Sequence, residues 1–91
     1  MSYRIPYQAK GGTRLDYVVP SYDEMTLDQY RKLAPIAKEF IEAENHIDQR
    51  IAIVSEMSGC PIGVLNDRPM KEVQEVFDFL QDQCIKAMQG S

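Results

Sequence analysis

The sequence predicts one mainly α-helical domain that begins with an N-terminal β-hairpin or extended arm. Apolar residues alternate with polar ones in the first part of the chain, which is the period of a β-strand. From residue 25 onward they recur at steps of three and four, which is the period of an α-helix. The chain has 91 residues, enough for a single compact domain, which we divide into an arm (1–24) and a helical part (25–91). Three to four short helices are expected, over about residues 26–44, 46–58, 61–65 and 68–88.

The arm, over about residues 3–19, is expected to form two short strands joined by a glycine turn. Apolar side chains alternate over its first half and again over residues 15–19, and Gly11-Gly12 lies between them. Pro6 lacks an amide N–H, so its strand is expected at an edge of the sheet. Because a two-stranded hairpin is marginally stable in water, it must lie on the helices, join a neighbour's sheet or stay mobile.

The predicted helix over 26–44 begins with a capping box and is interrupted by a proline. Thr26 is the N-cap, and Gln29 stands three residues later, where its side chain can bond back to the cap. Pro35 removes a hydrogen bond from a helix interior, which costs about 3 kcal/mol. It therefore either kinks the helix or separates a short first turn from a helix that begins near Pro35. The buried stripe is expected to contain Leu27, Tyr30, Ala34, Ala37 and Ile41, and Leu33, Ile36 and Phe40 are expected to widen it.

The helix over 46–58 is predicted to be the most buried, because apolar residues cover most of its circumference. Asn45 is its expected N-cap, with Asp48 at the third helical position. Gly59 is its expected C-terminal stop. The inward face is expected to contain Ile47, Ile51, Val54 and Ser58.

Two further helices are expected after the glycine stop. Pro61 can begin a single helical turn over 61–65, because proline is tolerated where a helix starts. Asn66 and Asp67 are expected to cap the last helix, over 68–88, with Pro69 in its first turn. The apolar spacing of this helix indicates a core face made of Val73, Val76, Phe77, Leu80 and Cys84.

Composition and charge argue against several classes of function. The net charge of −4 argues against a nucleic-acid-binding protein, which would need a basic stripe to neutralise phosphates. No apolar run approaches the length of a membrane span, and the N-terminus lacks the pattern of a signal peptide. Two cysteines make no disulfide framework, and Cys60 and Cys84 are expected to be buried free thiols. We therefore expect a cytoplasmic protein that binds neither membrane nor nucleic acid.

The motifs of the chain do not point to catalysis, to a cofactor or to a metal. His46 is the only histidine, and it has no partners at the spacing of zinc ligands, so a solvated or capping role is expected. Cys60 and His46 could in principle act as nucleophile and base, but nothing adjacent to them in sequence would activate the thiol. The glycines match no phosphate-binding loop. A non-enzymatic protein is expected.

Protein binding is the class of function that fits best, and the tyrosines of the arm suggest where. Tyrosine is enriched at interfaces because it buries area and keeps a polar tip. The alternative is that these tyrosines hold the hairpin onto the helices, and both interpretations stay open. Apolar residues also occur in the elbow after Gly59 and in the last turns of the final helix. The candidate partner-binding residues are Tyr3, Tyr7, Tyr17, Tyr22, Ile62, Val64, Leu65, Ile85 and Met88.

Four short motifs in the helical part form a pattern. They are Met25 to Tyr30, Ser55 to Pro61, Val64-Leu65 and Val73 to Leu80. Over residues 25–84 the chain thereby resembles small proteins encoded among the tail genes of tailed bacteriophages, which are regarded as tail assembly chaperones. The resemblance implies binding to the tape-measure protein, or to tail tube subunits, during assembly in the host cytoplasm. It brings no catalytic residues.

Two other classes of function compete with the chaperone. A virion structural subunit, such as a tail, baseplate or connector component, could use the hairpin to extend a neighbour's sheet. A small helical adaptor or regulator could bind a host protein. A homo-oligomer is compatible with all three, because the helices carry methionine and aromatic residues that could pair with a second copy.

Overall fold

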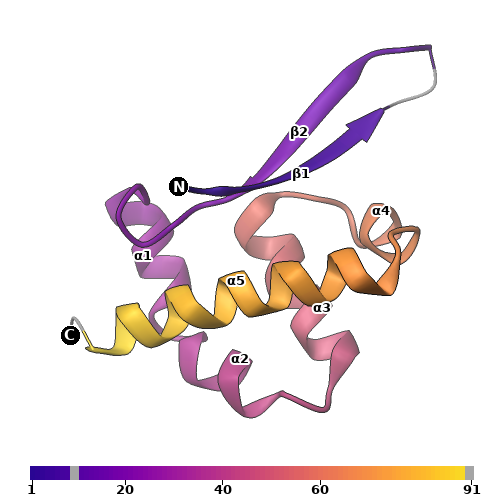
Figure 1. The fold of residues 1–91 in the computed structure, drawn as a ribbon. Coiled ribbons are helices and arrows are strands. Elements are labelled where there is room, and N and C mark those ends of the chain that lie inside the picture. The colour runs from indigo at the N-terminus through magenta and orange to yellow at the C-terminus, as the bar shows by residue number, and fades with distance from the viewer. Residues whose placement is uncertain (9–10, 90–91) are drawn as a thin grey trace.

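The computed structural model of the protein describes residues 1–8 and 11–89. It is mainly helical, with an antiparallel hairpin at the N-terminus, as predicted (Figure 1). The described residues form five helices, where three to four were expected. Residues 9–10 and 90–91, which belong to the predicted arm and helical part, lie outside the described residues. The elements are β1 (Tyr3–Gln8), β2 (Arg14–Val19), α1 (Leu27–Leu33), α2 (Ala37–Glu42), α3 (Ile47–Ser58), α4 (Ile62–Asn66) and α5 (Met70–Gln89).

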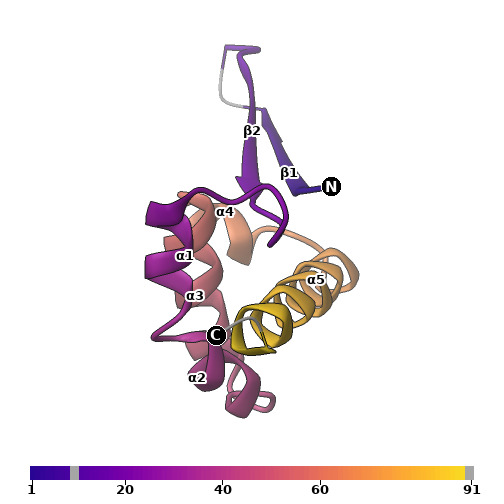
Figure 2. The same cartoon turned by 90° about the vertical axis from the view of Figure 1, so that its left-hand side faces the viewer.

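The hairpin rests on the helical body at its base and rises away from it toward its turn (Figures 1 and 2). β1 pairs with β2 in antiparallel register, from Tyr3 opposite Val19 to Gln8 opposite Arg14. At the base, Ile5 and Val19 are buried in the common core. In the turn, Gly11 has a φ of 98°, which glycine adopts readily because it has no Cβ. The base anchors the hairpin, as its marginal stability in water requires.

The helix predicted over 26–44 is two helices, α1 and α2, because Pro35 ends the hydrogen-bonded ladder of the first. The capping box is confirmed: the Gln29 N–H donates to the Thr26 hydroxyl, and the Thr26 N–H donates to the Gln29 side chain at 2.8 Å. Proline has no N–H to donate, and α2 begins only at Ala37. Of the two alternatives, a kinked helix or a separation at Pro35, the structure shows two separate helices.

Two residues of the predicted stripe are exposed, and the others are buried or partly buried. The predicted stripe is wrong for Leu27, which is 63% exposed, and for Ala34, which is exposed. Both exposed residues stand at the ends of α1, Leu27 as its first residue and Ala34 as its C-cap. The rest of the stripe is confirmed: Leu33, Ala37 and Phe40 are fully buried, and Tyr30, Ile36 and Ile41 are partly buried.

The N-terminal turn of α3 differs from the prediction, whereas its end agrees. The N-cap is His46 in place of Asn45, and its side chain makes no capping hydrogen bond. Ile47, predicted to face inward, is 48% exposed because it stands at the first position of the helix. Gly59 is the C-cap in the left-handed region, with a φ of 74°, which confirms it as the stop.

The last two helices follow the prediction with a shifted boundary. Pro61 is the N-cap of α4, whereas Asn66 and Asp67 end α4 and do not cap α5. α5 begins at Met70, two residues later than expected, and the carbonyl of Pro69 accepts hydrogen bonds from the first turn of α5. The core face of α5 is confirmed, since all of its predicted residues are buried: Val73, Val76, Phe77, Leu80 and Cys84.

α5 runs across the body with α1, α2 and α3 packed on it (Figures 1 and 2). The rings of Phe40 and Phe77 meet edge to face, with centroids 6.1 Å apart. Such pairs contribute about 0.5–1.5 kcal/mol beyond the area that they bury. Cys60 and Cys84 are both buried and free, as expected.

Arg50 of α3 is a buried cation that the sequence analysis did not single out. Arg50 is 3% exposed, and its guanidinium carbon lies 4.5 Å from the centroid of the Phe40 ring. Its Nε donates to the Phe40 carbonyl at 3.2 Å, and its Nη2 donates to the Gln81 side chain at 3.1 Å. Among the described residues, no carboxylate forms an ion pair with it. Packing on aromatic rings and two hydrogen bonds therefore hold this charge in the core.

Replacing Arg50 should show how much of its role is packing. Arg50→Ala should lower the free energy of unfolding by about 2–4 kcal/mol, because it opens a cavity and leaves the Phe40 carbonyl without this donor. Arg50→Met keeps most of the buried aliphatic volume and removes a buried charge, so its loss should be less than half as large. Urea denaturation measures both, with Arg31→Ala on the exposed face of α1 as the control. A methionine variant as unstable as the alanine variant would contradict this account.

A candidate protein-binding trough along the first strand

The hairpin has one apolar face, which continues beyond the helical body. Cross-strand partners lie on the same face of an antiparallel pair, so the register places Ile5 beside Tyr17 and Tyr7 beside Leu15. The inner residues of this face are buried, whereas Leu15 near the turn is 47% exposed. The rings of Tyr7 and Tyr17 lie 6.3 Å apart and cover part of its outer half. The apolar face thus passes from core to solvent along the hairpin.

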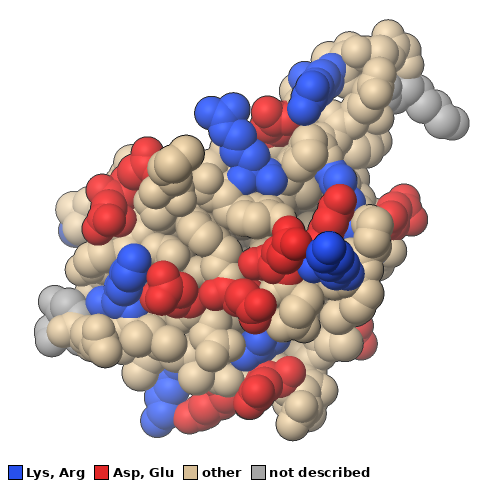
Figure 3. Space-filling model, viewed as in Figure 1, with Lys and Arg blue, Asp and Glu red and all other residues tan. Residues whose placement is uncertain are grey.

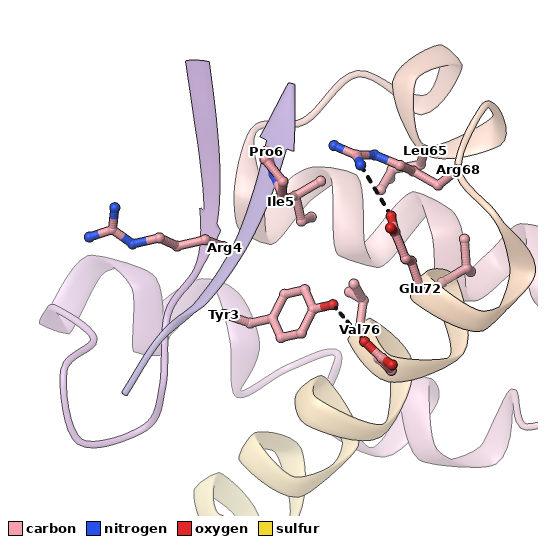
Figure 4. Close-up of a pocket in the computed structure, with 10 residues that line it drawn as sticks. Tyr3, Arg4, Ile5, Pro6, Leu65, Arg68, Glu72 and Val76 are labelled. Atoms are coloured by element: carbon pink, nitrogen blue, oxygen red, sulfur yellow. Dashed lines mark hydrogen bonds and ion pairs between the residues drawn. The ribbon is translucent and has the colours of Figure 1, made fainter. Parts of the chain in front are cut away.

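A hollow of about 240 Å³ opens between β1, α4 and the first half of α5 (Figure 4). Its walls are mainly apolar, with Ile5 and Pro6 on the side of the strand and Leu65 and Val76 on the side of the helices. Arg4 also belongs to this stretch of β1, but its side chain points away from the hollow (Figure 4). A hollow of this size and lining fits an apolar side chain of another molecule.

Polar contacts fix both sides of this hollow. The Tyr3 hydroxyl donates to the Glu75 carboxylate at 3.3 Å, and the ring of Tyr3 lies 5.7 Å from that of Phe79. Burial raises the pKa of the Tyr3 hydroxyl, and the nearby charge of Glu75 raises it further. Arg68 pairs with Glu72 at 3.1 Å (Figure 4). Tyr3 therefore holds the hairpin onto α5, which is one of the two interpretations of the arm tyrosines.

A second hollow, of about 270 Å³, adjoins the first toward the turn of the hairpin. Pro6 and Arg68 line both hollows, so the two form one depression along β1. Its outer half lies between Tyr7 and Val64. We call this depression the β1 trough; it is lined by Tyr3, Arg4, Ile5, Pro6, Tyr7, Gln8, Val64, Leu65, Asp67, Arg68, Pro69, Glu72, Val73, Glu75 and Val76.

The structure brings some of the predicted contact residues together at the trough and separates the rest. Tyr3, Tyr7 and Val64 line it, from two distant parts of the chain. Leu65 also borders it, but at 2% exposed it belongs to the core, so its prediction as a surface contact is wrong. Burial of Leu65 follows from its place on the inner side of the short helix α4.

The other predicted contact residues lie away from the trough. Tyr17 lies on the apolar face of the hairpin, and Ile62 is exposed on α4. The backbone N–H of Tyr22 donates to the Gln83 side chain at 2.7 Å, and its ring meets Tyr30 edge to face. Ile85 and Met88 are exposed in the last turns of α5. These positions make no single surface with the trough.

Sequence reasoning missed Pro6 and Arg68 as the residues that join the two hollows. Pro6 was considered only for its missing N–H, and Arg68 only as part of a helix start. Arg68 could have been singled out by its i,i+4 spacing to Glu72, which predicts an ion pair on one helical face. No local pattern indicates that residues near position 6 and position 68 meet.

Neither cysteine of the chain lines the trough. No cluster of three or more histidine, cysteine, aspartate or glutamate side chains in residues 1–8 and 11–89 is arranged to hold a metal ion. Burial raises the pKa of the Cys60 thiol, and it raises that of Cys84 to about 12. Both thiols are thereby kept in the weakly nucleophilic neutral form near neutral pH.

Charges on the surface are mixed in sign. Lysine and arginine side chains lie among aspartate and glutamate side chains over the face seen in Figure 3. This face shows no large region of one sign, so it would not steer a strongly charged partner over long range. The helices that the structure describes are too short or too polar for a membrane span.

Comparisons with protein-family models, with curated proteins and with solved structures find no match to this chain.

Alkaline pH should destabilise the protein through Cys84. Its folded-state pKa is raised, so its contribution to stability is fully present below the unfolded-state pKa, near 9, and is lost as pH rises toward about 12. Between pH 8 and pH 10 the free energy of unfolding should fall by about 1–2 kcal/mol on account of this thiol. Urea midpoints of the unmodified chain and of Cys84→Ala should therefore differ in their pH dependence. Equal slopes in the two proteins would contradict the burial of this thiol.

Proposed function

We propose that this protein is a non-enzymatic binding protein that takes up an extended apolar segment of another chain in the β1 trough. The trough is the single observation that carries the proposal, because it is an elongated depression with a mainly apolar inner hollow and with Tyr7 and Val64 beside polar residues at its open end. Its apolar walls favour apolar side chains, and the ion pair of Arg68 with Glu72 lies beside them. An extended segment can place alternate side chains into the two hollows.

The resemblance of residues 25–84 supplies the class of partner. We propose that the protein is a chaperone of phage tail assembly, which binds the tape-measure protein or a tail tube subunit in the cytoplasm of the infected cell. Apolar segments of such partners would be covered in the trough until assembly. The rigid base of the hairpin supports this role, because a preformed groove loses little conformational entropy on binding.

Tyr7 and Val64 offer a direct test of this proposal. The double variant Tyr7→Ala/Val64→Ala should weaken binding of tape-measure fragments about tenfold or more, because tyrosine side chains in desolvated pockets often carry 1–2 kcal/mol of binding energy or more. Calorimetry measures the affinity, and co-expression measures how much of the fragment stays soluble. Leu27→Ala, on α1 outside the trough, is the matched control and should bind as the unmodified chain does.

Two results would count against the proposal. One is no binding of any tape-measure or tail tube fragment by the unmodified chain. The other is an equal loss of affinity in Leu27→Ala and in the double variant. Circular dichroism checks that the variants are folded, because Val64 packs against the core although Tyr7 lies outside it.

A structural subunit of the virion is the second candidate, and the protruding hairpin favours it. The outer strand β2 has a free edge near the turn, to which a neighbour's strand could be added. Mass spectrometry of purified virions separates the candidates. A chaperone should be absent from mature particles, whereas a structural subunit should be present in them.

A further inference from the structure

The edge of β2 is the part of the hairpin that the helical body leaves uncovered near the turn. Both hollows of the trough are lined by residues of β1 and by none of β2. β2 meets α3, and it is buried only at its base, through Val19. Its outer residues Arg14, Leu15 and Asp16 are exposed, and the turn rises clear of the body in Figure 2. A second strand can therefore reach this edge.

Pro6 decides which backbone groups of β2 point outward. It stands opposite Asp16, and because proline has no N–H, this pair is assigned to the type that exchanges no hydrogen bonds. The N–H and C=O groups of Asp16 then point to the free edge. Those of Arg14 and Val18 do the same, since the direction alternates along a strand.

We propose that two copies of this chain pair antiparallel through their β2 edges, with Leu15 of each copy on the two-fold axis. In this register Arg14 of each copy stands opposite Asp16 of the other. Each such pair exchanges two backbone hydrogen bonds, and its side chains are of opposite charge on one face. Leu15 meets Leu15 of the second copy on the apolar face, where it covers a side chain that is 47% exposed in the single chain.

The charges of β2 select this register over its neighbours. Moving the two-fold axis by one residue, from Leu15 to Asp16, places Asp16 opposite Asp16 of the second copy, which brings two like charges together. Moving the axis by two residues, to Tyr17, places Asp16 opposite Val18 of the second copy. Arg14 of each copy then has no carboxylate opposite it. Only the register centred on Leu15 forms two opposite-charge pairs from the sequence Arg14-Leu15-Asp16.

The product is a four-stranded sheet in which the apolar faces of both hairpins are continuous. The β1 troughs stay open at its two outer edges, so this pairing neither requires nor blocks the proposed function. The interface is small, since only the outer half of each β2 takes part, and such interfaces give weak association. The dimer should therefore form at high protein concentration, in the range of about 0.1–1 mM.

Charge reversal tests the register by sedimentation equilibrium. Arg14→Asp and Asp16→Arg should each weaken the dimer about tenfold, because two attractive pairs become two repulsive ones. An equimolar mixture of the two variants should dimerise again, since one copy is acidic and the other basic at both positions. Arg14→Asp also breaks the ion pair of Arg14 with Asp16 inside one copy, 3.8 Å long. Arg4→Asp is the matched control, because it breaks the other ion pair of Asp16 inside one copy, 3.6 Å long, but lies on β1.

Three outcomes would overturn the proposal. They are an unmodified chain that stays monomeric at about 1 mM, a mixture that fails to recover the dimer, and an Arg4→Asp dimer as weak as the Arg14→Asp dimer. Failure of tape-measure binding would leave these measurements unaffected, so the two proposals fail separately.

A disulfide trap places the axis independently. Leu15→Cys puts two thiols opposite each other at a non-hydrogen-bonded pair, where Cβ atoms are close enough to bridge. Mild oxidation should then give a covalent dimer within minutes, whereas Val18→Cys should give at least tenfold less. The native thiols do not compete, because Cys60 and Cys84 are buried. Equal trapping at positions 15 and 18 would exclude an axis at Leu15.

Discussion

The burial of one face of α5 is the constraint on which the rest of the structure depends. The face is apolar except for the buried Gln83, and α1, α2, α3 and the base of the hairpin all cover it or its neighbours. In a chain of this size little of the core is redundant, because small domains bury a smaller fraction of their surface. Loss of any covering element would expose part of this face to water.

The hairpin shows how this constraint divides an element into two halves. A two-stranded sheet has too few contacts to be stable alone, so its base is held by Ile5, Val19 and the Tyr3–Glu75 hydrogen bond. The outer half has no such support and keeps Leu15 in solvent. Because apolar residues alternate along both strands, the apolar face that anchors the base continues into the outer half. There it is exposed, next to the free edge of β2. Both proposed interactions use parts of the hairpin that the helical body does not cover: the open side of the β1 trough and the edge of β2.

Arg50 illustrates how a polar group is accommodated in so small a core. Its aliphatic part packs among apolar residues, and its guanidinium lies over Phe40 and bonds to a backbone carbonyl at the end of α2. It thereby connects α2, α3 and, through Gln81, α5. A charge in this place specifies how the three helices meet, because apolar side chains alone would tolerate more than one arrangement.

Local rules sufficed to predict the start and stop signals of several elements. The capping box at Thr26, the glycine stop at Gly59 and the core face of α5 follow from chemistry within a few residues, and all are confirmed. The tyrosines of the arm were also identified from composition, although their two interpretations could not be separated. Tyr3 packs on the body, and Tyr7 borders the trough.

The tertiary structure alone decided the rest, because it depends on contacts between distant parts of the chain. Whether Pro35 kinks or divides a helix depends on which residues the neighbouring helices can bury, and the packing also leaves Leu27, the first residue of α1, at the surface. The trough exists because β1 and the α4–α5 segment meet across about sixty residues of sequence, which no periodicity of two or 3.6 encodes. The sequence by itself thus determined the hairpin, several helix ends and the buried face of α5, and only the packing decided where a helix divides and where an apolar face stays open.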